Sequence, residues 1–161
     1  MSERAAALIE RLALEPHPEG GYFSEVHRSG ATVNPLDGRP HRPAVTTIYY
    51  MLVAGQHSRW HRVSSDEVWH FYEGDPLELL VAPPSLADVQ RVVLGPAADS
   101  SRPMHPVPAS WWQAARPRGE YALVGCTVAP GFEFADFVLL REDPAAYAAL
   151  QRFDSRLLAL V

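Results

Sequence analysis

Short stretches of alternating or continuous apolar residues follow one another along most of the chain. β-Branched and aromatic side chains are frequent in them, which favours strands over helices. Residues typical of turns separate the stretches at intervals of about 8 to 12 residues, as in sandwiches and barrels. The predicted strands cover residues 22–28, 44–53, 57–63, 67–72, 77–82, 89–94, 106–108, 111–115, 121–128 and 133–140.

Helical patterns occur only near the two ends of the chain. Ser2 can cap a first helix that ends near Leu14, before Pro16. Asp143 and Pro144 suit the N-cap and the first position of a C-terminal helix. We therefore expect one all-β domain over residues 1–161 with short terminal helices. A barrel of this size has room inside for side chains or one small ligand.

One predicted strand places a carboxylate on a face that should be buried. Glu67, Trp69 and Phe71 alternate onto the same side of residues 67–72. A buried carboxylate is costly unless it is paired, and His61 or Arg59 could be its partner. If His61 pairs with it, the carboxylate would orient the imidazole and make it a general base near neutral pH.

Composition narrows the possible chemistry. All 14 basic residues are arginine, so lysine bases and lysine Schiff bases are excluded. A net charge of −5 without a basic, aromatic-rich patch argues against a nucleic-acid partner. The sequence contains no long apolar run, so we expect no membrane partner, and the first residues do not resemble a signal peptide. The lone Cys126 suits a cytoplasmic location.

The segment from residue 55 to residue 74 resembles the first motif of the cupin superfamily, G-x5-H-x-H-x3-E-x6-G. Gly55, His61, Glu67 and Gly74 occur at the spacings of that motif, and Val63 replaces its second histidine. In the dTDP-sugar epimerases, a histidine at the position matching His61 removes a proton next to a carbonyl. The resemblance therefore implies that His61 is a catalytic base.

The later segment PASWWQ resembles the second cupin motif, P-x-G-x-x-H, with Ser110 in place of the glycine and Gln113 in place of the histidine. Together, HPEGGYF, SSDEVWHFYEG, VPASWWQA and PGFEFADF are similar to the cupin_5 subgroup, whose fold is similar to that of the dTDP-sugar epimerases. The resemblance implies a cupin-type jelly-roll β-barrel (double-stranded β-helix) and a homodimer. It implies no particular substrate.

The usual metal ligands of cupins are incomplete in this sequence. Metal cupins use three histidines and one glutamate, and this chain keeps His61 and Glu67. Val63 has no donor atom, and the amide oxygen of Gln113 is a poor ligand for a transition metal. Two good ligands rarely hold a catalytic metal, so we expect no cofactor. A divalent metal at His61 and Glu67 is the alternative.

The leading hypothesis is a metal-independent isomerase or epimerase that acts on a sugar-like or other small polar metabolite. Its catalytic candidates are His61, Glu67 and, as the acid, Tyr49. A non-catalytic small-metabolite binding protein and a metal-dependent cupin enzyme with an incomplete ligand set are the alternatives. The candidate ligand contacts are Gln113, Trp69, Phe71, Glu25 and Phe23.

Several nearby residues have weaker signals. Glu19, Glu25 and Arg28 either line the mouth of the barrel or belong to a plain structural strand. His17 lies beside prolines and is expected in solvent, whereas Trp60 is expected to face outward, where a dimer interface could bury it. The epimerase segment R-G-x-F-x-E is matched only in part, and the lack of its arginine weakens the expectation of nucleotide-diphosphate binding.

Overall fold

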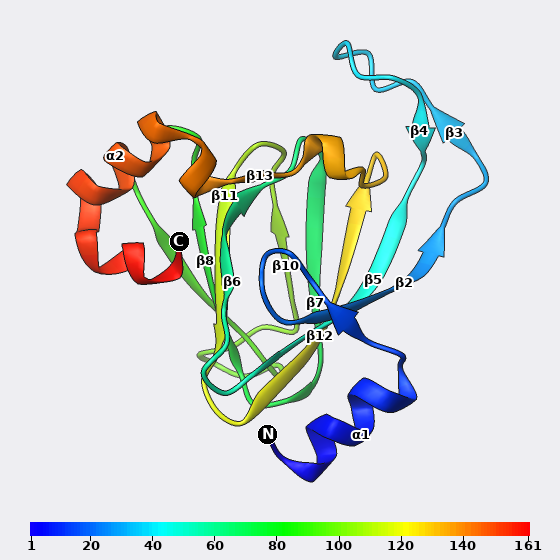
Figure 1. Ribbon diagram of the computed structural model, residues 1–161, viewed down its shortest axis with the longest axis vertical. Helices are drawn as coiled ribbons and strands as arrows, with labels where there is room; N and C mark the ends of the chain where they lie inside the picture. The colour runs from blue at the N-terminus through cyan, green and yellow to red at the C-terminus, as the bar shows by residue number, and fades with distance from the viewer.

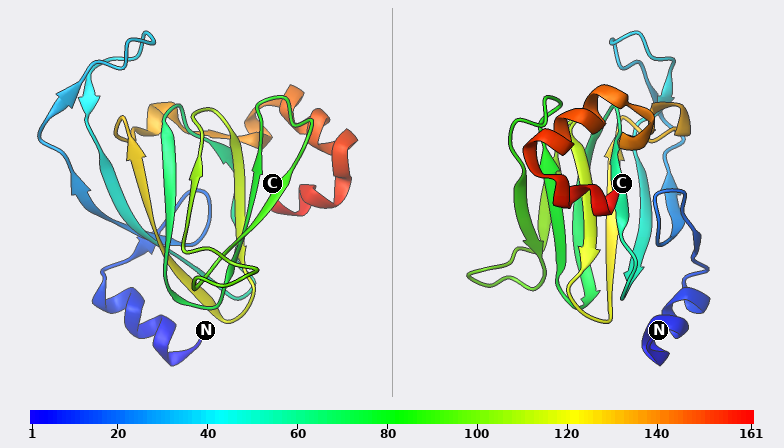
Figure 2. Two further views of the ribbon diagram at one scale, coloured as in Figure 1. Left: turned by 180° about the vertical axis from the view of Figure 1, so that it is seen from behind. Right: turned by 60° about the vertical axis from the view of Figure 1, so that its left-hand side comes forward.

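The computed structural model describes residues 1–161, and it forms two facing antiparallel sheets wrapped into a barrel (Figures 1 and 2). The first sheet has the order β1 (Glu15–Pro16), β2 (Tyr22–Arg28), β5 (Thr46–Val53), β12 (Tyr121–Ala129), β7 (Asp66–Gly74) and β10 (Met104–Val107). The second has the order β13 (Val138–Leu139), β6 (Ser58–Arg62), β11 (Trp112–Pro117), β8 (Leu77–Ala82) and β9 (Gln90–Leu94). The structure thus confirms the all-β class.

Helical segments lie outside the barrel. They are α1 (Glu3–Arg11), α2 (Pro144–Asp154) and the 3-10 segments η1 (Phe134–Asp136), η2 (Leu140–Glu142) and η3 (Ser155–Leu160). Figure 2 shows the N-terminal and C-terminal helices on different sides of the barrel. As predicted, the side chain of Ser2 caps α1 and that of Asp143 caps α2. No helix is both long and apolar enough to cross a membrane.

Two segments differ from the sequence prediction. The strand expected over residues 133–140 is wrong, because η1 and the start of η2 occupy half of it and only the two-residue β13 is extended in a sheet. The segment between the predicted strands 22–28 and 44–53, where no strand was predicted, contains a short hairpin of β3 (Thr32–Val33) and β4 (Arg42–Pro43). This hairpin belongs to an arm that projects from the barrel (Figure 1).

Strand alternation divides side chains between the barrel interior and the outer helices. On β5, Tyr50 and Leu52 join the interior core, whereas Met51 and Val53 pack with α1. Trp60 faces outward, as its position predicts, and its indole N–H donates to the carbonyl of Leu157 at 3.2 Å. The chain's own C-terminal helices therefore bury Trp60, and a dimer interface is not needed to do so.

Candidate active site

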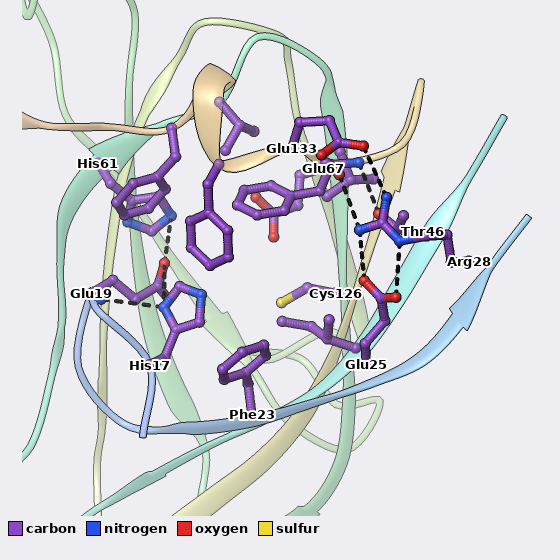
Figure 3. A pocket seen from close by; sticks show the side chains of 16 residues that line it. His17, Glu19, Phe23, Glu25, Arg28, Thr46, His61, Glu67, Cys126 and Glu133 are labelled. Atoms are coloured by element: carbon purple, nitrogen blue, oxygen red, sulfur yellow. Dashed lines mark hydrogen bonds and ion pairs between the residues drawn. The ribbon is translucent and has the colours of Figure 1, made fainter. Parts of the chain in front are cut away.

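A cavity occupies part of the barrel interior, lined by strands β2, β5, β6, β7 and β12 together with the segments around residues 17–19 and 132–137 (Figure 3). The cavity has a volume of about 90 Å³, counted as the space that the centres of water molecules can occupy. This is room for several waters or a small organic molecule. Its lining combines phenyl rings with carboxylates, imidazoles and one guanidinium. The residues of these kinds are Phe23, Phe132, Phe134, Phe137, Glu19, Glu25, Glu67, Glu133, His17, His61 and Arg28.

The imidazole of His61 is buried and fixed in orientation. Its Nδ1 lies 2.7 Å from the carbonyl oxygen of Arg59, which can only accept, so the proton on Nδ1 is assigned from this contact. Nε2 lies 3.2 Å from Oε2 of Glu19 and 3.1 Å from the amide nitrogen of Gln113, and the residue lines the cavity. Nε2 is therefore the nitrogen that gains and loses a proton, and Glu19 can accept a hydrogen bond from its protonated form.

Gln113 joins the two cupin motifs behind the cavity. It lies opposite His61 in the β11–β6 ladder and is fully buried. The indole N–H of Trp69 donates to its Oε1 at 2.8 Å, which fixes the amide orientation because an indole nitrogen only donates. The amide Nε2 then donates to Glu67 at 2.5 Å and lies 3.1 Å from Nε2 of His61.

The N-terminal loop supplies two residues to the site: Glu19, which the sequence analysis placed at the mouth or in a plain strand, and His17, which it expected in solvent. Glu19 is buried and accepts a hydrogen bond from the hydroxyl of Ser58 at 2.9 Å, while its other oxygen contacts His61. His17, expected in solvent, instead lines the cavity with only 6% of its side chain exposed. Figure 3 shows Glu19 between the two imidazoles. The carboxylate beside Nε2 of His61 is thus Glu19, and Glu67 reaches the imidazole through Gln113.

Gly20 explains how this loop comes so close to β6. Its φ of +111° is favourable only for glycine, and an added Cβ would lie within van der Waals overlap of the carbonyl oxygen of His57. The hydroxyl of Tyr50 also donates to the carbonyl of Gly20 at 2.8 Å. These contacts hold Glu19 against β6. The paired glycines of HPEGGYF were the signal in the sequence that could have indicated this close approach.

Burial shifts two of the site's titratable groups in opposite directions. Burial raises the pKa of Glu67; the charge of Glu19 adds to this effect, and His61 and the amide of Gln113 oppose it. Burial lowers the pKa of His17, against the opposing attraction of Glu19. His17 is therefore held in its neutral form, and Glu67 retains a proton to higher pH than an exposed carboxyl group.

The tautomer of the neutral His17 follows from its backbone contact. The amide N–H of Glu19 donates to Nδ1 of His17 at 3.2 Å, so Nδ1 carries a lone pair and Nε2 carries the proton. The ring packs edge-on against Phe23, with 4.6 Å between the ring centroids. His17 therefore offers a fixed N–H donor beside an aromatic wall.

The rim of the cavity contains a guanidinium held by two carboxylates. Arg28 donates to Glu25 at 2.8 and 3.0 Å and to Glu133 at 3.0 Å. All three side chains line the cavity. Since β2 contributes Glu25 and Arg28 while Glu133 follows β12, these ion pairs connect two strands at the mouth.

Three of the expected site residues lie away from the cavity lining. Tyr49 shares the outward face of β5 with Met51 and packs near α1, so it is not placed to act as the acid in this cavity. Trp69 and Phe71 do face the barrel interior with Glu67 but contribute to its apolar core. Each two-residue step along a strand moves a side chain by about 7 Å, which carries both rings away from the mouth.

The remaining ligand candidates are placed at or beside the cavity. Phe23 and Glu25 line it directly. Gln113 lies behind it and reaches the lining through His61 and Glu67. Contact of these residues with a ligand stays a prediction.

The donor set does not fit the usual metal of a cupin. Val63, at the position of the second histidine, lines the cavity without a donor atom. Gln113, at the position of the last histidine, turns its NH₂ group toward His61 and Glu67, so it presents hydrogen atoms where a cation would need a lone pair. No group of three or more His, Cys, Asp and Glu side chains is arranged to hold a metal ion. We derive no step through a metal.

Two antiparallel sheets wrapped into a barrel, with residues of both motifs meeting inside it, define a cupin-type protein. The sequence model of the Cupin_5 family, described as Cupin superfamily (DUF985), matches residues 6–140, and the chain belongs to this family. No curated protein matches the chain.

Solved structures agree with this family and fold. A Shewanella oneidensis protein is 31% identical with a TM-score of 0.84, and the match covers 97% of this chain and 96% of that one. A hypothetical protein from Leishmania major is 32% identical with a TM-score of 0.81, over 98% and 96% of the two chains. An oxalate decarboxylase from Bacillus subtilis, at 13% identity and a TM-score of 0.56 over 78% of this chain and 29% of that one, shows similarity of fold alone.

Proposed function

We propose that this protein is a metal-independent isomerase or epimerase that moves a proton on a carbon next to a carbonyl group of a small polar metabolite. The observation that carries the proposal is the fixed imidazole of His61. Its Nδ1 contacts a backbone carbonyl, its Nε2 lies beside the buried carboxylate of Glu19, and the residue lines the cavity. This arrangement suits a general base, because Glu19 stabilises the imidazolium formed when Nε2 takes up a proton.

His17 and Glu67 supply the other two functions that such a reaction needs. When His61 removes the proton, the C–H bond breaks and its electron pair moves onto the carbonyl oxygen. The N–H of the neutral His17 can donate to that oxygen and stabilise the negative charge. Glu67, whose pKa is raised by burial, can hold a proton and return it to the carbon. No redox change accompanies this sequence.

Exchange of substrate hydrogen with solvent tests this function directly. The protein is incubated in D₂O with a panel of aldoses, ketoses and amino sugars, and loss of the proton next to the carbonyl is followed by ¹H NMR. We expect exchange of one compound class, and we expect His61→Asn to slow it by about 10²- to 10⁴-fold. The matched control is His41→Asn, because His41 is exposed on the projecting arm and its replacement should leave the rate unchanged.

Two results would contradict the proposal. Exchange at the wild-type rate in a folded His61→Asn protein would remove His61 from the role of base. Saturable binding of a compound in the panel, with neither exchange nor product, would support the non-catalytic binding protein instead. Circular dichroism and the unfolding midpoint establish that each variant is folded.

A further inference from the structure

The cavity lining carries more negative than positive charge. Four carboxylates, those of Glu19, Glu25, Glu67 and Glu133, face the single guanidinium of Arg28, a sum of −3 with both histidines neutral. If Glu67 holds a proton and His61 carries one, three carboxylates still face two cations, a sum of −1. Such a lining attracts cations and repels anions.

Phenyl rings surround the same space without an arginine stacked on them, although the imidazoles of His61 and His17 lie 5.3 Å from Phe137 and 6.1 Å from Phe134 between ring centroids. The rings of Phe132, Phe134 and Phe137 lie nearly edge-on to one another, with centroids 5.0 to 6.4 Å apart. The cation–π contact within the chain lies outside this cavity, where Cζ of Arg62 is 4.6 Å from the ring centroid of Trp112. The faces of phenyl rings attract ammonium groups, most strongly when water is excluded.

Two polar atoms of the lining form no hydrogen bond within the chain and are accessible from the cavity, whereas the fully buried polar atom without a partner is Nε1 of Trp112, outside this site. Gln113 donates to Oε2 of Glu67, but no N–H or O–H group donates to Oε1, although the residue is only 6% exposed. His17 accepts at Nδ1, whereas its Nε2–H has no acceptor. Figure 3 shows both side chains turned toward the hollow centre. Both atoms are therefore open to a ligand, which should offer an acceptor to His17 and a hydrogen-bond partner to Glu67.

We propose that the substrates of this site are small metabolites that carry a protonated amine next to a carbonyl or hydroxyl oxygen, as amino sugars do. The ammonium group would lie among the phenyl rings, attracted by the net negative charge of the lining, and the oxygen would accept from His17. This inference rests on the proposed function, since the same oxygen is the one polarised during proton removal. Sugar phosphates and nucleotide-diphosphate sugars would be excluded, because their charge has the same sign as that of the lining.

Binding measurements with matched sugars test the charge preference without requiring turnover. Glucosamine, glucose and glucose 6-phosphate have similar rings and differ in charge at neutral pH. We expect isothermal titration calorimetry of the 161-residue protein to show glucosamine binding about tenfold more tightly than glucose. Glucose 6-phosphate should bind more weakly than either.

Two rim variants should change glucosamine binding in opposite directions. Glu25→Gln removes a negative charge and should weaken it about 3- to 10-fold, whereas Arg28→Gln removes a positive charge and should strengthen it by a similar factor. Glu10→Gln is the control, because it makes the same charge change on the exposed surface of α1 and should have no effect. Glucose binding should change little in any of them.

The outcomes separate this inference from the proposed function. Equal or tighter binding of glucose or glucose 6-phosphate, or rim variants that shift glucosamine affinity in the same direction, would overturn the inference. If deuterium exchange dependent on His61 is then found with a neutral sugar, the proposed function survives alone. Selective glucosamine binding without exchange of any compound supports the cationic ligand class and contradicts the proposed function.

Discussion

Replacement of Gln113 by leucine tests the hydrogen-bond network behind the cavity. Leucine has a similar volume, but it can neither accept from the indole of Trp69 nor donate to Glu67. The backbone of β11 and its register with β6 and β8 need not change. The variant therefore removes polar partners from a buried position while keeping its packing.

The expected loss follows from the two groups left unpaired. A buried indole N–H without a partner costs about 1 to 2 kcal/mol, and a buried carboxylate that loses a hydrogen bond costs about 1.5 to 3 kcal/mol. His61 keeps its contact with Glu19, so it adds little. We expect Gln113→Leu to lower the free energy of unfolding by about 2.5 to 5 kcal/mol. In a domain of this size that corresponds to a fall in Tm of about 5 to 20 °C.

Part of this loss of unfolding free energy should depend on pH, and the pKa of Glu67 determines whether the loss grows or shrinks as the pH falls. The amide of Gln113 lowers that pKa, so its removal raises the pKa further in the folded state. A folded pKa above the unfolded one costs stability at pH values above both, and the cost disappears as the pH falls below the unfolded value of about 4.3. The deficit of Gln113→Leu should therefore be largest at pH 7 to 8 and smaller near pH 5.

Urea unfolding followed by tryptophan fluorescence measures this difference. Gln151→Leu is the matched control, because Gln151 is exposed on α2 and its replacement should change stability by no more than about 0.5 kcal/mol. A loss below about 1 kcal/mol at pH 7.5, or a deficit that grows in acid, would refute the assignment of Gln113 as the partner of both buried groups.

Three further predictions concern other parts of the molecule. Gly74→Ala should lower the free energy of unfolding by more than about 2 kcal/mol, because its Cβ would collide with the carbonyl oxygen of Tyr121. Gly55→Ala has a similar positive φ but open space around it, so it should lower that free energy by only about 1 kcal/mol; equal losses in urea unfolding would contradict the steric argument. The pKa of His17, followed by NMR, should lie below 6.5 in the folded protein, because burial lowers it. The free energy of unfolding contributed by the neutral His17 is therefore fully present above pH 6.5 and is lost as the pH falls toward the pKa of His17 in the folded state. Asp143→Ala should lower the free energy of unfolding by about 1 kcal/mol through loss of the α2 cap; no change in the unfolding midpoint would count against the capping hydrogen bond.

Local patterns predicted the strands and the direction of most side chains on them. The alternation that placed His61 inward and Trp60 outward depends only on the pleat of one strand, so neighbouring residues are sufficient to infer it. The same alternation could not test the choice of Tyr49 as the acid, because aromatic residues occupy both faces of β5 and only α1 determines which face lies outside.

Contacts between distant segments were not predictable in the same way. Glu19 bonds to Ser58 across 39 positions, and no periodicity in either segment indicates this pairing. His17 resembled a solvated residue because prolines flank it, yet the turn after it folds back over the barrel. The strand expected over residues 133–140 was wrong because its apolar residues follow the cavity wall in a 3-10 turn, where phenyl rings face a hollow and no regular ladder forms.

The C-terminal helices have a consequence for how this protein is divided in the laboratory. The family match ends at residue 140, but Leu150 and Leu157 beyond it cover the indoles of Trp60 and Trp112. A recombinant fragment cut at the end of the match would keep both motifs and expose a broad apolar sheet face to water. A boundary chosen from the family match, at residue 140, would therefore cut through the cooperative folding unit. We expect a fragment truncated there to aggregate when it is expressed.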